Sequence, residues 1–438
     1  MSNFAVYSVM KHFKAIVIGI LVTVLLCGMK AQGQDYPWLA NNNIMVEARV
    51  HYGFFYHHHF EMERFNKHYG AFEASVYQNT YGKNEWEPNY NYPYIGATFY
   101  YSDLGGFEEL GQVFALYPFI NYPLNRNEKS QFTFKLGVGL AYLTKHFDPF
   151  NNYYNFSIGS HLNAAVNLSF EYRQRITSRL MSVASVGLTH FSNGSTKLPN
   201  YGLNTFSAAI GLAYYLRKPR LNLTPAVRPE YYPFEFDKKK WLSFDLDYGI
   251  GFKNVSQTLG GDSTYYYTVH DLSFYALGQF TQYSRAGFGL SCVLDFSDQT
   301  LPNHRALDNG YVQVVKTDPI THVRYFDTIS VYQLTKLNLS ICYAMTMDRL
   351  SYYFEFGWHL KYNKYTDLGK GNIFQKVSLR YRVYNDIYAH ISLMTHFGRA
   401  DYLCFGLGYR FNQKYYLNHE KSTKRYPPGV RNHRSERL

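Results

Sequence analysis

Alternation of large apolar side chains with polar or small ones runs along most of this 438-residue chain, and it constrains the fold more than any other feature. In segment 132–143, Phe132 and Leu136 share one face, whereas Thr133 and Lys135 share the other. A period of two is typical of a β-strand with one apolar face. A charged second face suits the polar interior of a barrel, not the core of a soluble sandwich. The pattern therefore predicts an all-β fold, an antiparallel transmembrane β-barrel.

The composition agrees with this interpretation. Charged residues make up 17% of the chain, whereas about a quarter is usual for a soluble domain. Aromatic residues make up 19%, with 45 Tyr and 34 Phe. The apolar content excludes an intrinsically disordered chain.

The first segment has the features of a secretory signal peptide, which we expect to span 1–33. Lys11 and Lys14 precede an apolar core at 15–26, and Ala31 and Gly33 fit a cleavage site of small residues. No later segment is apolar and long enough for a transmembrane helix, so any spanning structure after the signal is expected to be β. We expect the protein in the outer membrane of a Gram-negative bacterium.

The formal net charge of +12 raises the question of an anionic partner. The basic residues are scattered over the strand-like segments or lie in the last segment, 413–438, which we interpret as a basic disordered tail. This distribution favours anionic outer-membrane lipid as the partner, and no nucleic acid is expected.

The strand-like segments form two similar halves. We predict about sixteen strands, eight in each half, in domains 34–218 and 240–412. The Pro-bearing segment 219–239 is expected to be a periplasmic linker, and 298–327 a long outer loop. Three pairs of segments match in order: LTHFSNG (188–194) with MTHFG (394–398), NTFSAAIGLAYYL (204–216) with DYLCFGLGYRF (401–411), and FKLGVGLAYL (134–143) with FEFGWHLKYN (354–363). The pattern leaves open whether one large barrel or two fused barrels form.

One constellation combines residue types that carry chemistry. His190 and Ser192 lie on the apolar, lipid-facing side of one predicted strand, and Asn204 heads the apolar stripe of the next. A hydroxyl, an imidazole and an amide at one barrel end suit nucleophilic catalysis, with Ser192 attacking an ester, His190 taking its proton and Asn204 orienting the ring. The side-chain amides of Asn193 and Asn200 could donate to the oxyanion. On spacing alone, the alternative is that these polar residues simply lie at the water interface.

The segment HFSNGSTKLPNYGLN (190–204) resembles the signature of the outer-membrane lipid A deacylase family (PagL-type). The resemblance implies a serine esterase that removes the ester-linked 3-position acyl chain from lipid A of lipopolysaccharide. It implies that Ser192 is the nucleophile and His190 the base, and it puts Asn193 and Asn200 where oxyanion-stabilising residues lie. Asn204 falls where well-known members carry Glu, which is a departure from the family pattern.

The second half lacks this constellation, because His396 is followed by Phe397 and Gly398, so we expect it to be catalytically silent. A Ser-His mechanism implies no cofactor, and no zinc spacing is present. The consecutive His57, His58 and His59 alternate faces of a strand and cannot all bind one ion. Two alternatives remain: a non-catalytic pore or structural barrel that retains the motif, and an adhesion barrel acting through its outer loops.

Overall fold

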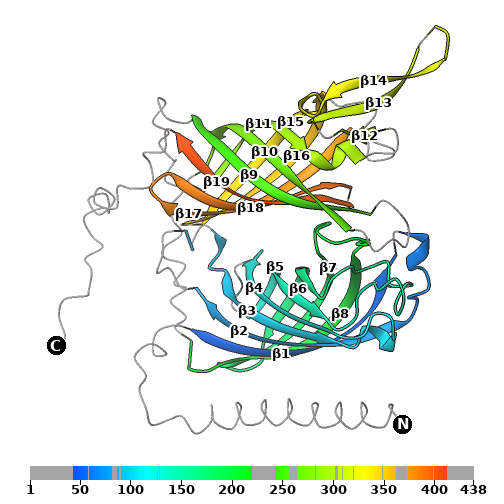
Figure 1. Cartoon of the computed structure of the whole chain (residues 1–438). Helices are drawn as coiled ribbons and strands as arrows, with labels where there is room; N and C mark the ends of the chain where they lie inside the picture. The colour runs from blue at the N-terminus through cyan, green and yellow to red at the C-terminus, as the bar shows by residue number, and fades with distance from the viewer. Residues whose placement is uncertain are drawn as a thin grey trace.

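The computed structural model contains two closed antiparallel β-barrels of eight strands each, which answers the question of one barrel or two (Figure 1). The structure describes residues 43–57, 59–80, 86–87, 90–125, 127, 129–219, 242–256, 264–281, 283–300, 304–307, 309–318, 320–347, 349–361, 372–397 and 399–411. The expected signal peptide and basic tail lie outside these residues, and so does the expected linker except for Pro219. No helix in the described ranges is long and apolar enough to cross a membrane.

The first barrel, barrel 1, follows chain order, and β8 pairs with β1 to close it. Its strands are β1 (Ile44–Tyr56), β2 (His68–Asn79), β3 (Tyr94–Ser102), β4 (Val113–Pro123), β5 (Ser130–Leu143), β6 (Leu162–Arg175), β7 (Leu180–Ser192) and β8 (Leu203–Tyr215). Two short 3₁₀ helices, η1 (Phe60–Met62) and η3 (Leu104–Gly106), lie in its connections. We call the end with the connections 144–161 and 193–202 the loop end, and the opposite end the turn end.

The second barrel, barrel 2, closes through pairing of β19 with β9. Its strands are β9 (Leu242–Ser256), β10 (Thr264–Gln279), β11 (Ser284–Asp295), β15 (Lys336–Met347), β16 (Leu350–Lys361), β17 (Ile373–Tyr384), β18 (Ile387–His396) and β19 (Arg399–Phe411). The expected long loop 298–327 is not irregular throughout. It contributes to a separate three-stranded sheet of β12 (His304–Ala306), β13 (Tyr311–Thr317) and β14 (Arg324–Ser330), flanked by η5 (Phe296–Thr300) and η6 (Val331–Leu334). The β13–β14 hairpin projects from the barrel (Figure 1).

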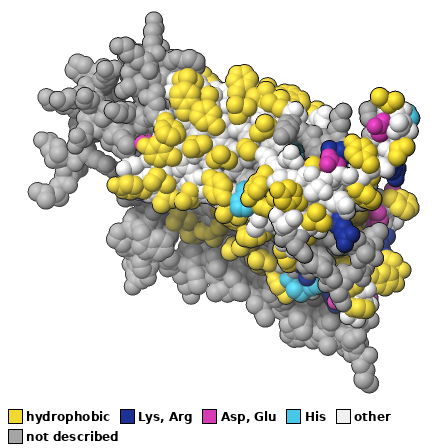
Figure 2. Space-filling model, turned by 45° about the horizontal axis from the view of Figure 1, so that its top comes forward, with side chains coloured by type: hydrophobic (Ala, Val, Ile, Leu, Met, Phe, Trp, Pro, Cys, Tyr) yellow, Lys and Arg dark blue, Asp and Glu magenta, His cyan; other side chains and the backbone are white. Residues whose placement is uncertain are grey.

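The alternation in the sequence corresponds to the two faces of each barrel wall. Val186 and Ile210 point outward and are largely exposed, and hydrophobic side chains spread over the outer surface of barrel 2 (Figure 2). This apolar belt is what a lipid environment requires of a spanning strand.

The inward face carries ion pairs that fill the lumen. In barrel 1, the Glu171 carboxylate accepts hydrogen bonds from Arg49 at 2.6 Å and from Arg173 at 3.0 Å. In barrel 2, Asp245 accepts from Arg410 at 2.9 Å and from Arg380 at 3.3 Å. All of these side chains are buried. An eight-stranded barrel has an interior just wide enough for side chains, so charged groups there must pair with one another.

The two barrels touch at both ends. At the turn end, Trp86 and Ile120 of barrel 1 form one buried apolar cluster with Tyr283 and Met347 of barrel 2. At the loop end, segment 193–198 of barrel 1 is hydrogen-bonded to barrel 2. Contacts at both ends hold the barrels side by side with their loop ends together.

Candidate functional site

The imidazole of His190 and the amide of Asn204 form the centre of the site. The two residues are register partners on β7 and β8, so the sheet places them side by side. The Nδ1 atom of His190 lies 2.6 Å from the Oδ1 atom of Asn204. Because an amide oxygen only accepts, Nδ1 carries the proton and donates it, which leaves the Nε2 lone pair available to act as a base.

Gly202 allows the imidazole to occupy this position. A Cβ atom on Gly202 would lie 2.6 Å from Cε1 of His190, well inside van der Waals contact. Its backbone also has a φ of +78°, which favours glycine. Any side chain at 202 would therefore displace the ring. Sequence reasoning did not single out Gly202, because its role depends on a contact between two strands.

Ser192 is the last residue of β7 and shares the outward face with His190. Its side chain is buried, with 6% of the residue exposed. The described hydrogen bonds of its Oγ atom include one from the Gly194 N–H at 3.2 Å but none with His190. Side chains two apart on a strand are about 7 Å apart, so a hydrogen bond between Ser192 and His190 would require rotation of the serine and of the ring. Catalytic hydrogen bonds are often long before substrate binds.

The two asparagines between Ser192 and Asn204 have different surroundings. The Nδ2 atom of Asn193 donates to the Lys197 carbonyl at 2.7 Å and to Ser160 Oγ at 3.1 Å, so this amide holds the loop. The Oδ1 atom of Asn200 accepts from the Asn193 N–H at 3.1 Å. Its Nδ2 atom is buried and has no hydrogen-bond partner among the described residues. Asn200 therefore has a free donor at the site.

The connection between β5 and β6 supports the site loop, which is the β7–β8 connection at 193–202, from within barrel 1. The N–H groups of Tyr201 and Gly202 donate to the carbonyls of Phe156 and Ser157, at 3.2 and 2.9 Å. Gly159 lies so close to the site loop that a Cβ atom there would be 2.5 Å from the Lys197 carbonyl oxygen. Ser160 contributes its Oγ atom to Asn193, as described above. These supporting residues carry no motif that the sequence alone would reveal.

The matching segments of barrel 2 agree with barrel 1 at one place and differ at another. Phe134 and Phe354 both point outward, and Lys135 and Glu355 both point inward. His396, however, is buried inside barrel 2, with its Nε2 atom 3.5 Å from Asp401, whereas His190 lies on the outer face of barrel 1. A shift of one residue in a strand moves every side chain to the other face. The two histidines are therefore not equivalent in position.

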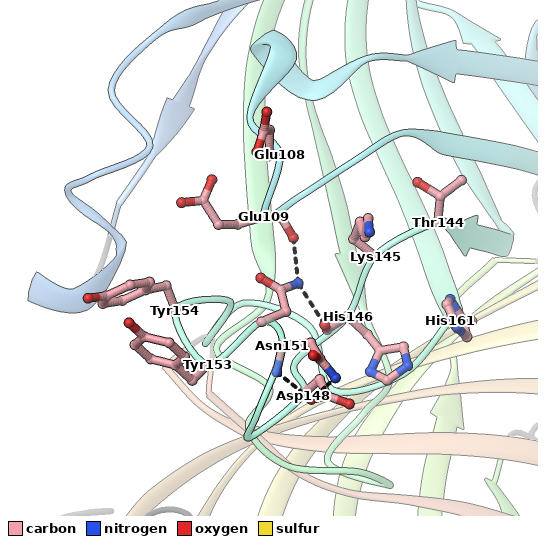
Figure 3. A pocket seen from close by; sticks show the side chains of 11 residues that line it. Glu108, Glu109, Thr144, Lys145, His146, Asp148, Asn151, Tyr153, Tyr154 and His161 are labelled. Carbon is pink, nitrogen blue, oxygen red and sulfur yellow. Dashed lines mark hydrogen bonds between the residues drawn. The ribbon is translucent and has the colours of Figure 1, made fainter. Parts of the chain in front are cut away.

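A separate polar pocket of about 490 Å³ opens at the loop end of barrel 1 (Figure 3). Lys145, His146, Asp148, Tyr153 and His161 are among the residues that line it. Partial burial lowers the pKa of His146. The segment 144–161 both lines this pocket and supports the site loop. None of the five candidate residues, His190, Ser192, Asn193, Asn200 and Asn204, is among the lining residues of the pocket.

In the described part of the chain, no three His, Cys, Asp or Glu side chains are grouped so that they could hold a metal ion. Of the three consecutive histidines, His57 bonds through Nε2 to the Phe65 carbonyl at 2.8 Å, and His59 stacks on Tyr201. His58 lies outside the described residues.

Closed antiparallel barrels with an apolar outer face and a charged, paired interior define the class of this protein: it is a β-barrel protein of the outer membrane. Residues 70–213 match the family model for lipid A 3-O-deacylase (PagL), and residues 242–413 match that for the C-terminal domain of acyloxyacyl hydrolase. Together the matches cover more than two thirds of the chain. The chain belongs to the PagL-type family of lipid A deacylases. Its second barrel corresponds to the C-terminal domain of acyloxyacyl hydrolase, which has a separate family model.

Other comparisons give weaker similarities. No curated protein matches the sequence. Among solved structures, the outer-membrane enzyme PagL is 16% identical, with 38% of this chain and 97% of that chain covered and a TM-score of 0.27. A Rhodopseudomonas blastica porin is 6% identical, with 84% and 99% covered and a TM-score of 0.16. Sequence identities and TM-scores this low support no further conclusion about this chain.

Proposed function

We propose that this protein is an outer-membrane serine esterase that removes the 3-position acyl chain from lipid A of lipopolysaccharide. The observation that carries the proposal is the His190–Asn204 hydrogen bond on the lipid-facing rim, beside Ser192. This bond fixes the tautomer that a general base needs. The family of the chain supports the substrate, because its model over 70–213 describes a lipid A 3-O-deacylase.

In the proposed reaction, Nε2 of His190 takes the proton of Ser192 while Oγ attacks the ester carbonyl. The oxyanion that forms accepts a hydrogen bond from Nδ2 of Asn200, the free donor at the site. The intermediate collapses to an acyl-serine, and the sugar hydroxyl leaves with the proton held by His190. Water, activated by the same imidazole, then hydrolyses the acyl-serine and releases a fatty acid.

The position of the site on the barrel suits a lipid substrate. His190 and Asn204 lie at the ends of the outward stripes that contain Val186 and Ile210. An acyl chain that lies along this apolar surface in the outer leaflet brings its ester to the level of Ser192. The lipid substrate therefore does not have to leave the bilayer to reach the site.

The experiment that tests the proposal is incubation of the purified, refolded protein with lipopolysaccharide, followed by mass spectrometry of the lipid A. The wild type is expected to remove one hydroxyacyl mass, and Ser192→Ala is expected to remove none. Ser182→Ala is the matched control, since Ser182 lies on the same face of β7 near the turn end. Unchanged lipid A from the wild type, over several acylation patterns, would overturn the enzyme proposal.

The rival pore interpretation finds little support in the described lumens, which are filled by paired charged side chains. An adhesion role through the outer loops keeps one specific feature in its favour, the projecting β13–β14 hairpin with exposed Ile320 and Phe326. Deletion of the hairpin tip separates this role from catalysis. Adhesion predicts loss of surface binding, whereas the esterase proposal predicts unchanged acyl release.

A further inference from the structure

The site loop of barrel 1 is attached to barrel 2 by backbone and side-chain hydrogen bonds. The N–H of Asn254 donates to the Ser195 carbonyl at 3.1 Å, and its Oδ1 atom accepts from the Leu198 N–H at 3.2 Å. Ser195 Oγ also donates to the Ala400 carbonyl at 3.0 Å. One residue of β9, Asn254, thus holds two points of the loop that follows Ser192, one through its backbone N–H and one through its side chain.

Asn254 lies at a position where the wall of barrel 2 otherwise presents apolar side chains to the outside. It ends the outward stripe of β9 after Ile250 and Phe252, which are exposed. An amide on a lipid-facing surface is costly without hydrogen-bond partners. Asn254 is instead 1% exposed, because the loop of barrel 1 covers it. The contact with barrel 1 accounts for a polar residue at this position.

Gly194 shows that the loop packs closely against barrel 2. A Cβ atom there would lie 3.3 Å from Cβ of Leu403 and 3.7 Å from Cδ1 of Leu393. Its φ of +63° also favours glycine. The N–H of the same residue donates to Ser192 Oγ. Barrel 2 therefore contacts the residue that is bonded to the proposed nucleophile.

Residues 195–198, which are bonded to barrel 2, lie between Ser192, the proposed nucleophile, and Asn200, the proposed oxyanion donor. Asn193, directly before Gly194, is bonded through its N–H to Asn200 and through Nδ2 to the Lys197 carbonyl. A shift of Ser195 or Leu198 therefore moves Asn200 relative to Ser192. Misplacement of a catalytic group by about 1 Å can reduce a rate by about 100-fold.

We infer that barrel 2 is part of the catalytic unit, with Asn254 as a positioning residue that holds the 193–200 loop in its active geometry. The inference rests on the proposed esterase function. It gives the second barrel a role in the reaction, although that barrel lacks a nucleophile of its own.

The test uses the full-length protein with lipopolysaccharide as substrate and a fluorophosphonate probe for labelling of Ser192. Asn254→Leu removes the acceptor at similar volume, and we expect kcat to fall about tenfold to 100-fold with little change in KM. The rate of labelling at Ser192 should fall in parallel. Asn254→Asp keeps an acceptor for the Leu198 N–H and should restore most of the activity. Phe252→Leu, on the same stripe, is the control that should leave kcat unchanged.

Ser195→Ala provides a second, milder variant, because it removes only the hydroxyl bonded to Ala400. It should lower kcat severalfold in a protein with unchanged melting temperature. Wild-type values of kcat and labelling in both Asn254→Leu and Ser195→Ala would overturn the inference while leaving the esterase proposal intact. Absence of both acyl release and Ser192 labelling in the wild type would overturn the esterase proposal, and the inference with it.

Discussion

Asn204 Oδ1 lies 2.6 Å from His190 Nδ1, across the β7–β8 pair, and this one bond sets which imidazole nitrogen is free. A carboxylate in place of the amide would accept the same hydrogen bond and would also stabilise the imidazolium of the proposed reaction. The amide therefore supplies orientation without charge.

Substitution of Asn204 separates these two effects. Asn204→Leu should lower kcat by at least about tenfold, because the ring loses its only described orienting partner on β8. Asn204→Asp should raise kcat above the wild type, since a charge-assisted hydrogen bond is about twice as strong as a neutral one. Single-turnover acyl release, followed by mass spectrometry, gives both rates. Equal rates for Leu and Asn at this position would contradict the orienting role.

Gly202→Ala should abolish most of the activity without unfolding barrel 1. The new methyl group would meet His190 Cε1 at 2.6 Å and push the ring away from Asn204. Gly310→Ala is a matched control, because Gly310 has the same φ of +78° but no atom within 4 Å of the added Cβ. Kinetics and thermal melting of the two variants isolate the contact with His190 from backbone strain. A Gly202→Ala protein as active as Gly310→Ala would show that the ring position does not matter.

Glu171→Leu should destabilise barrel 1 strongly. The change removes the carboxylate that pairs with both Arg49 and Arg173 and leaves two buried guanidinium groups with fewer partners. Loss of one member of a buried ion pair costs about 3–5 kcal/mol in the free energy of unfolding. Guanidinium-induced unfolding in detergent measures the change, and Phe170→Leu on the exposed outer face is the control. A difference of less than about 1 kcal/mol between the variants would contradict a tightly paired lumen.

Purified protein in a planar bilayer should give no steady channel current. The described interiors of both barrels are filled by buried side chains such as Lys135, Arg173 and Arg380. Eight strands leave room for side chains but not for an aqueous channel. Stable ohmic conductance that persists in Ser192→Ala would instead favour the pore interpretation.

Asp298, in η5 between β11 and β12, should make the stability of barrel 2 depend on pH. Burial, together with the neighbouring Asp295 carboxylate, raises the pKa of Asp298 to about 6. The folded state therefore binds a proton more tightly than the unfolded state, whose carboxyl has an ordinary pKa of about 4. This contribution to stability is present at low pH and is lost as the pH rises from about 4 to about 6. Melting temperatures over that range should fall less steeply for Asp298→Asn than for the wild type, and identical slopes would contradict the shift.

Much of the fold follows from local pattern. The alternation of Phe134 and Lys135 recurs at Phe354 and Glu355, and in both barrels it gives the face of the strand correctly. The grouping of His190 and Asn204 could also be predicted, because adjacent antiparallel strands bring the start of one beside the end of the other. Strands β12 to β14 were not predicted, although Val312 and Val314 alternate with Gln313 and lie in a buried cluster with Val331 and Leu334.

The remaining features depend on contacts that local pattern does not encode. Period-two alternation is the same for one barrel of sixteen strands and for two of eight, and the pairing of β8 with β1 distinguishes them. The similar segments around His190 and His396 face opposite sides of their walls, because register is set along the whole strand. The bond between Asn254 and Leu198 joins residues from different barrels, so no spacing in the chain reveals it. Alternation records how each strand meets lipid and lumen, whereas the hydrogen bonds of the loop after Ser192 to Asn254 and Ala400 depend on the packing of one barrel against the other.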